Sequence, residues 1–329
     1  MISSIYAASA RRRREWYSAR PESRRRLRRP VISVGNIAVG GRGKTPFTAA
    51  LARILLETGE VPAILSRGYA RTQAVDGAVV VRDRGGIRAD VARAGDEPMM
   101  LARQLDGAIV MSGPDRYVSG RLAEHHLGAT VHLLDDGFQH FQLDRDIDIV
   151  LVGEGDLNGR TLPGGRLREP PDVLVAADAI VAIHHGLRIT APHAAVFAAR
   201  RRVGPAVFDE TGGPPPVPGA RVLAVAGIAD PAPFFAALTS AGWLVAETRI
   251  FRDHHPFSSR DVADLFATAR RAGAAAVLTT EKDLMRLRPH RPFALPVGWA
   301  PLTMEPEPPD EFRRWLAVSL GAARDSIIG

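Results

Sequence analysis

The sequence predicts an α/β protein of two domains, the larger with a mainly parallel sheet and the second a smaller α/β domain. A β-branched run at 31–34 is followed by a glycine-dense loop and by helically spaced apolar residues at 47–57, and this order indicates a strand, a loop and a helix. Short apolar runs then alternate with helical segments, as in a parallel sheet covered on both faces. A Pro- and Gly-rich stretch at 204–219, typical of a linker, precedes a second alternation of this kind.

Composition limits the classes of protein that the chain can represent. Its 329 residues are enough for two domains, and 46% hydrophobic with 24% charged residues is ordinary for a soluble globular protein. The absence of cysteine excludes disulfides, thiolate metal sites and cysteine nucleophiles. No apolar run approaches the ~18 residues of a membrane span, and no signal peptide is expected because the arginines follow the weakly apolar start.

Residues 1–30 are expected to form a basic amphipathic segment on a membrane surface. Ten arginines and two glutamates precede Val31, a balance of +8, so the rest of the chain carries −1 of the total +7. A helix here would place its large apolar residues on one side, namely Ile2, Ile5, Tyr6, Trp16 and Tyr17. Ser9 and Arg13 interrupt that side. Basic helices with aromatic residues suit anionic membranes; a nucleic-acid-binding arm and a solvated terminus are the alternatives.

The segment 38–45 predicts a nucleoside-triphosphate site in a P-loop NTPase-like domain. Glycines let backbone N–H groups surround phosphate oxygens at a helix N-terminus, Lys44 would reach the β- and γ-phosphates, and the Thr45 hydroxyl would ligate Mg²⁺. The strict Walker A pattern has Gly where this chain has Ala38, and a glycine-rich turn with a surface lysine is the alternative. The expected nucleotide-binding residues are Ala38, Val39, Gly40, Gly41, Arg42, Gly43, Lys44 and Thr45.

Further elements complete the P-loop domain, expected at 31–203, and the smaller domain, expected at 220–329. In the first, strands are expected at 62–65, 79–82, 108–111, 131–134 and 147–152, and helices at 99–105 and 115–126. In the second, strands are expected at 222–226, 244–248 and 276–279, and helices at 231–241, 259–272 and 308–320. Short apolar runs bounded by turn residues indicate the strands, and longer runs with helical spacing indicate the helices.

Asp135 and Asp136 follow the apolar run 131–134 directly, which is the Walker B arrangement. Carboxylates in this position emerge at the carboxyl end of a strand, where open α/β sheets bind ligands, and their hard oxygens suit Mg²⁺. We therefore expect Thr45, Asp135 and Asp136 to be the metal ligands. An Asp-Asp-Gly turn with a purely structural role is the alternative for this motif taken alone.

Three further motifs suit phosphoryl transfer and also have structural explanations. Asp96 precedes a helix, so it fits either an N-cap or a general base for an attacking hydroxyl. The triplet Asp-His-His at 253–255 suggests a metal site, with a structural role as the alternative for His255; manganese phosphoesterases with such a triplet need further Asp/His motifs and no P-loop. Arg168 follows a glycine-rich turn, where an arginine can hold a phosphate through two hydrogen bonds or lie in solvent.

Together these motifs resemble one family, the tetraacyldisaccharide 4'-kinases, which are the lipid A 4'-kinases of Gram-negative envelope synthesis. The matching segments run in the family's order from about 31 to 283 and are VGNIAVGGRGKTP, SRGY, GDEP, DDGFQH, LPGGRLRE, the DHH segment and TEKD. The family usually has a small non-glycine residue at the position of Ala38. The resemblance implies transfer of the ATP γ-phosphate, with Mg²⁺, to the 4'-hydroxyl of a tetraacylated disaccharide 1-phosphate by a peripheral protein on the cytoplasmic face of the inner membrane.

The resemblance also implies roles for individual residues. Asp96 matches the catalytic base, paired with His254 of the second domain, and Asp136 belongs with the catalytic acids of the Walker B motif. Positions linked with the lipid headgroup or the wall of the site are matched by Asn36, Tyr69, Arg116, His140, Arg168 and Glu169. Closure of the two domains across the linker is a hypothesis that this pairing suggests. Members of the family often begin with a more apolar helix, so attachment to the membrane is expected to be more electrostatic here.

Two other functions are compatible with parts of the sequence. A P-loop ATP-dependent ligase or synthetase for a soluble metabolite would leave the N-terminal segment and the combined GDEP and DHH motifs unexplained. A nucleic-acid-binding ATPase predicts basic residues beyond Arg29, whereas the remainder of the chain is nearly neutral. No nucleic-acid partner is therefore expected.

Overall fold

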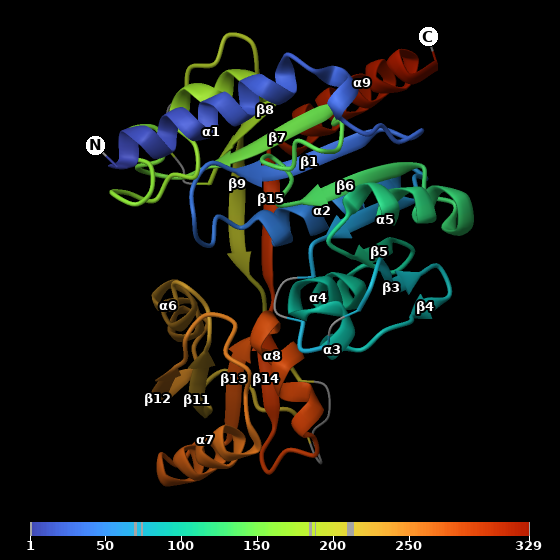
Figure 1. Cartoon of the computed structure of the whole chain (residues 1–329). Coiled ribbons are helices and arrows are strands. Elements are labelled where there is room, and N and C mark those ends of the chain that lie inside the picture. Colours follow the sequence, from blue (N-terminus) through green and yellow to red (C-terminus); the bar gives the residue numbers. More distant parts are fainter. Residues whose placement is uncertain are drawn as a thin grey trace. The chain divides into compact units, whose positions relative to one another are not determined.

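The computed structural model describes residues 2–68, 71–73, 75–183, 186–187, 189–208 and 214–328, and at residue 328 it describes the backbone alone. The chain divides into two compact units. The first contains Met1–Arg201 and Met304–Gly329, and the second contains Arg202–Thr303. Both units are α/β, as the sequence predicts (Figure 1).

A ten-stranded sheet forms the centre of the first unit in the described part of the chain, in the order β15-β9-β8-β7-β1-β6-β2-β5-β3-β4. Pairing is parallel from β9 across to β5, while β3 and β4 are antiparallel at one edge. The strands are β1 Val31–Asn36, β2 Pro62–Ser66, β3 Val79–Asp83, β4 Gly86–Ile87, β5 Ile109–Ser112, β6 Val131–Asp135, β7 Ile147–Val152, β8 Ala179–Ala182, β9 Ala195–Val203 and β15 Leu302–Glu307.

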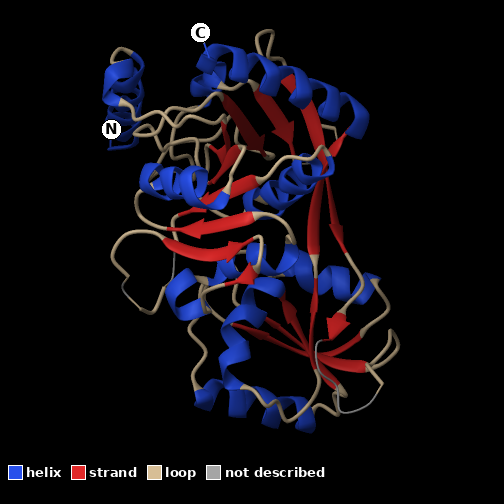
Figure 2. Ribbon diagram, turned by 90° about the vertical axis from the view of Figure 1, so that its right-hand side faces the viewer, coloured by secondary structure: helices blue, strands red, loops and turns tan. Residues whose placement is uncertain are grey.

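Helices lie on both faces of this sheet (Figure 2). All six residues of β1 are buried although successive side chains point to opposite faces, so both faces at the centre of the sheet are covered. The helices are α1 Ile2–Ser18, α2 Lys44–Glu57, α3 Val91–Ala94, α4 Asp96–Gln104, α5 Arg116–Leu122 and α9 Pro309–Ile328. Shorter helical turns occur at Pro21–Ser23, Ala123–Leu127 and Pro171–Ala176.

The second unit has a five-stranded sheet in the order β10-β14-β13-β11-β12 among the residues that are described. Its strands are parallel except for β10, which pairs antiparallel with β14. They are β10 Val207–Phe208, β11 Arg221–Ala226, β12 Leu244–Ile250, β13 Ala276–Thr280 and β14 Val297–Ala300. The helices are α6 Ala232–Ser240, α7 Ser259–Arg271 and α8 Glu281–Leu287, followed by a short turn at Arg288–His290.

The division into units differs from the expected one at the C-terminal end. The smaller domain was expected at 220–329, but β15 and α9 belong to the first unit, where Figure 1 shows α9, in red, with the large sheet. The reason is packing: Phe312 of α9 is fully buried, and its ring lies 5.1 Å from that of Phe197 in β9 and 5.9 Å from that of Phe47 in α2. The 204–219 stretch is also more than a linker, because β10 lies in it.

Candidate functional site

The candidate site is built at the carboxyl ends of β1 and β6, which are adjacent parallel strands. Val34 of β1 is in register with Asp135 of β6. The loop that leaves β1 after Asn36 and the acids that end β6 therefore start from the same edge of the sheet. Close packing supports this edge, because a Cβ on Gly35 would lie 2.4 Å from the Cβ of Phe138.

The phosphate-binding loop lies beside the 160–169 loop and ends at a left-handed glycine. The Val39 N–H donates to the Arg166 carbonyl at 2.7 Å, and Ala38 forms a β-bridge with Leu167. Gly43 has φ 77° at the N-cap of α2, a conformation that favours glycine. The loop therefore delivers its backbone N–H groups to the N-terminus of a fourteen-residue helix, where anions are stabilised.

Lys44 and Thr45, the first residues of α2, both reach the Walker B acids. The Lys44 Nζ lies 3.2 Å from the Asn36 Oδ1 and 3.6 Å from the Asp136 Oδ1. The Thr45 hydroxyl donates to the Asp135 Oδ2 at 3.1 Å. Two motifs separated by 90 residues thus meet as the sequence predicts, although their roles toward a ligand stay a prediction.

The two acids have opposite electrostatic surroundings. Burial, together with the neighbouring Glu97 and Asp136 carboxylates, raises the pKa of Asp135 to about 7. Burial would also raise the pKa of Asp136, but Lys44 and Arg168 outweigh it and hold that pKa below its usual range. Asp136 therefore faces cations, whereas Asp135 faces Thr45, Thr48 and a second carboxylate.

Arg168 of the predicted glycine-rich loop is engaged with a Walker B acid and does not lie free in solvent. Its Nη1 donates to both carboxylate oxygens of Asp136, at 3.0 and 2.9 Å, and its backbone N–H donates to the Ile37 carbonyl at 2.6 Å. Asp136 takes φ 60°, which is uncommon for a non-glycine residue. The contacts with Lys44 and Arg168 supply a physical reason for this backbone conformation.

Arg116 begins α5 and is 6% exposed. Burial and the nearby Arg67 lower its pKa, while Asp135 and Asp136 act in the opposite direction. His140 lies nearby, and burial, Arg116 and Arg145 lower its pKa to about 4. Both residues are thus electrostatically coupled to the site, while Tyr69 lies outside the described residues.

Asp96 is the first residue of α4 and is 1% exposed. Gly95 occupies the N-cap position, and the Asp96 Oδ1 accepts the Glu97 N–H at 2.9 Å. The alternative that Asp96 is the N-cap is therefore wrong, although a carboxylate in the first turn of a helix is stabilised by the helix dipole. Its role as a base stays a prediction.

In the second unit, His254 takes φ 56° and its Nε2 lies 2.8 Å from the Lys282 Nζ. His255 stacks on Phe251 with ring centroids 4.7 Å apart and contacts Asp261 through its Nε2 at 3.2 Å, as expected of a structural histidine. No cluster of three or more His, Cys, Asp or Glu able to hold a metal occurs among the described residues. The metal site suggested for this triplet is therefore not found there, and the pairing of His254 with Asp96 stays a prediction.

The oxygen ligands near Asp135 nevertheless fit a magnesium ion that also binds the phosphates of a nucleotide. One hydroxyl, on Thr45, and the carboxylates of Asp135 and Glu97 are hard oxygen ligands in one region. Mg²⁺ usually takes one or two carboxylates together with substrate phosphates and water. Asp136, expected as a third ligand, is oriented toward Lys44 and Arg168 instead.

Three residues that the sequence analysis did not assign to the site belong to this arrangement. The Glu97 carboxylate helps to raise the pKa of Asp135, Thr48 donates to the Asp135 Oδ1 at 3.4 Å, and Gln139 contacts Glu169 at 2.9 Å. Each had a sequence signal: Glu97 and Gln139 lie inside the GDEP and DDGFQH motifs, and Thr48 follows Thr45 at a spacing of three on the same helix face.

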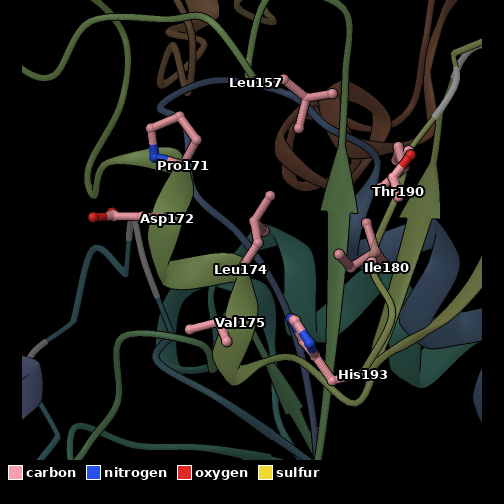
Figure 3. A pocket seen from close by; sticks show the side chains of 10 residues that line it. Leu157, Pro171, Asp172, Leu174, Val175, Ile180, Thr190 and His193 are labelled. Atoms are coloured by element: carbon pink, nitrogen blue, oxygen red, sulfur yellow. The ribbon is translucent and has the colours of Figure 1, made fainter.

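A separate pocket of about 300 Å³ lies beside the Pro171–Ala176 turn (Figure 3). Its lining is largely apolar and includes Leu157, Leu174, Val175, Ile180 and Ile189. None of the predicted site residues lines it. Its rim residue Asp172 forms an ion pair with Arg11 of α1 at 2.7 Å.

Comparison with known proteins gives a consistent result. The family model for tetraacyldisaccharide-1-P 4'-kinase matches residues 1–320. A tetraacyldisaccharide 4'-kinase of Geobacter metallireducens is 41% identical over 298 residues, 88% of each chain, and one of Bradyrhizobium sp. is 41% identical over 308 residues, 90% of this chain and 85% of the relative. The crystal structure of LpxK from Aquifex aeolicus in complex with ATP superposes with a TM-score of 0.80 at 30% identity, covering 97% of both chains. The chain belongs to the tetraacyldisaccharide-1-P 4'-kinase family.

Proposed function

We propose that this protein is an ATP-dependent lipid kinase that phosphorylates the 4'-hydroxyl of a tetraacyldisaccharide 1-phosphate. The observation that carries the proposal is the meeting of Lys44 and Thr45 with Asp135 and Asp136 at one sheet edge, in a chain that belongs to a kinase family. A ligase for a soluble metabolite would use the same phosphate-binding loop and the same two acids, but it would not explain the exposed apolar side of α1.

In the proposed phosphoryl transfer, each residue of the site has a role. Asp96 accepts the proton of the 4'-hydroxyl, the hydroxyl oxygen bonds to the γ-phosphorus, and the bond from that phosphorus to the oxygen shared with the β-phosphate breaks, so ADP leaves with the electron pair. Lys44 and the loop N–H groups neutralise charge on the phosphates, and positioning supplies most of the rate. Arg116 and His140 are proposed to contact the sugar and its 1-phosphate, and Asn36 and Glu169 are proposed to support the wall of the site from buried positions.

Magnesium is proposed to bind at Thr45 and Asp135 with help from Glu97. When bound, it would neutralise charge on the β- and γ-phosphates. Its positive charge would also favour the ionised form of Asp135, whose pKa is raised by burial and by neighbouring carboxylates.

The N-terminal helix α1 is proposed to attach the protein to an anionic membrane surface. Its partly buried positions, such as Ala7, Ala10 and Arg14, recur at helical spacing and face the body of the first unit. Most of its large apolar residues lie on the exposed side, where Ile2 is 69% exposed and Trp16 is 45% exposed. Tyr17, expected on that side, is instead partly buried, and its ring centroid lies 5.6 Å from that of Phe141. The helices of the described residues include none that is long and apolar enough to cross a membrane.

The proposal is tested by transfer of labelled γ-phosphate from ATP to purified tetraacyldisaccharide 1-phosphate in detergent micelles. Wild type should form the 4'-phosphorylated product, and Asp96→Asn should lower kcat by roughly a hundredfold or more because the base is lost while the side-chain shape is kept. The matched control is Asp90→Asn, at the exposed N-cap of α3, which should keep wild-type turnover. Absence of labelled lipid with wild type would refute the proposed function, and normal turnover of Asp96→Asn would refute the base.

A further inference from the structure

Arg14 differs from the other arginines of α1 in being largely buried. Its side chain is 12% exposed and that of its partner Glu169 is 3% exposed. The Arg14 Nε donates to Glu169 Oε1 at 2.9 Å, and its Nη2 donates to Oε2 at 2.8 Å. The guanidinium carbon also lies 4.2 Å from the ring centroid of Phe138 and 4.9 Å from that of Phe141, a geometry that favours arginine over lysine.

The contacts of Glu169 continue from α1 to the phosphate-binding loop. The Gln139 Nε2 donates to Glu169 Oε2 at 2.9 Å and to the Asn36 backbone carbonyl at 3.0 Å. The Asn36 Oδ1 accepts from the Lys44 Nζ at 3.2 Å. A series of polar contacts therefore joins Arg14, through Glu169, Gln139 and Asn36, to the lysine that is expected to hold the phosphates.

Few other contacts orient the two amides in this series. The Asn36 Nδ2 and the Gln139 Oε1 are buried without a hydrogen-bond partner among the described residues. Loss of the two hydrogen bonds from the Arg14 guanidinium would leave the Glu169 carboxylate buried without the cation that bonds to it. An unpaired buried carboxylate is unfavourable, so Glu169 would either move or take up a proton. Either response would disturb the contact of Glu169 with Gln139, and through Gln139 and Asn36 it would reach Lys44.

We propose that Arg14 is a positioning residue, through which the seating of α1 on the body of the protein sets the phosphate-binding loop. The helix proposed to meet the membrane would then also hold the nucleotide site in its working arrangement. The inference rests on the proposed function for the meaning of the site, but its contacts lie entirely within the first unit, so it can be tested by nucleotide binding alone.

The test compares Arg14→Gln with Arg11→Gln in the full-length protein in detergent, without lipid substrate. Arg11 is the matched control because it lies on the same helix, loses the same charge, and pairs with Asp172 at a site where the two side chains are 46% and 58% exposed. The dissociation constant for a fluorescent ATP analogue with Mg²⁺ is measured by titration. We expect Arg14→Gln to raise it about fivefold, the size of a coupled network contact, and Arg11→Gln to change it less than twofold.

Arg14→Lys separates positioning from charge and from folding. It keeps the positive charge over the aromatic rings but cannot form the two-pronged contact with Glu169, so its affinity should lie between those of wild type and Arg14→Gln. If circular dichroism shows that Arg14→Gln does not fold, the nucleotide affinity of Arg14→Lys alone tests the positioning role. Wild-type affinity in the folded Arg14 variants, or equal weakening by Arg11→Gln, would overturn the inference.

Lipid phosphorylation by wild type is measured in the same preparations. No phosphorylated lipid, combined with weakened nucleotide binding in Arg14→Gln only, would defeat the proposed substrate and leave the positioning role standing. Phosphorylated lipid combined with unchanged nucleotide binding in both Arg14 variants would refute the positioning role and leave the proposed substrate standing.

Discussion

At the scale of single residues, His140 gives stability a dependence on pH. Burial, with Arg116 and Arg145 nearby, lowers its pKa to about 4, below the ~6.5 of an unperturbed histidine. Between these two values the unfolded chain takes up a proton that the folded chain does not. The free energy of unfolding therefore falls as the pH drops from about 6.5 to about 4. At pH 7, where His140 is neutral in both states, it does not lower that free energy.

The prediction compares wild type with His140→Gln by urea denaturation at pH 7 and pH 4.5. The stability of wild type relative to the variant should fall by up to about 3 kcal/mol between these two pH values. The control is His125→Gln, which removes a histidine from an exposed position. A difference for His140→Gln that is the same at both pH values would contradict the lowered pKa.

The site residues that the sequence could predict were those in short motifs with fixed backbone context. Lys44, Thr45, Asp135 and Asp136 follow strands or begin a helix, so their meeting follows from the geometry of a parallel sheet. The different surroundings of Asp135 and Asp136 could not be predicted, because they depend on Arg168 and Glu97 from loops and helices elsewhere in the chain. The pairing of Arg14 with Glu169 spans 155 residues and left no local signal.

At the scale of secondary-structure elements, most short apolar strands were predictable, whereas β9 and β15 at one edge of the large sheet were not. β1, β2, β6 and β7 are short apolar runs with few competing features. β9 was not predicted because it combines apolar residues with Arg200, Arg201 and Arg202, and β15 contains Pro306 and two glutamates. Such strands owe their place to pairing with neighbours across the sheet and not to their own composition.

Helix α9 provides the prediction at this scale. Phe312 is fully buried between Phe47 and Phe197, so Phe312→Ala should lower the free energy of unfolding of the first unit by about 3–5 kcal/mol. Trp315, whose ring lies 5.6 Å from that of Phe312, contributes a local fluorescence signal for urea denaturation. The control is Val318→Ala on the same helix, where the side chain is 74% exposed and the change should stay within about 0.5 kcal/mol. An unchanged midpoint for Phe312→Ala would contradict the contribution of the Phe312 packing to the stability of the first unit.

At the scale of the whole molecule, the positive charge of the N-terminal segment is smaller at its surface than the sequence suggested. Several arginines are paired with carboxylates of the same unit: Arg11, Arg14, Arg24, Arg25 and Arg26. The exposed arginines without a carboxylate within 4.0 Å among the described residues are Arg12, Arg13, Arg20, Arg28 and Arg29. About half of the arginines that precede Val31 thus remain to attract an anionic surface.

The proposed attachment of α1 to membranes is therefore expected to combine a salt-sensitive and an apolar contribution. Binding to vesicles that contain anionic lipid, measured by sedimentation, should fall steeply between 50 mM and 500 mM salt, because screening shortens the reach of exposed charges. Arg12→Gln with Arg20→Gln should reduce binding at low salt roughly thirtyfold, since each exposed arginine near such a surface contributes about 1 kcal/mol. Arg11→Gln, which removes an arginine already paired with Asp172, should reduce it less. Binding that is insensitive to salt and to the double substitution would show that Ile2, Ile5 and Trp16 carry the attachment, and α1 would then act as an inserted helix rather than an electrostatic one.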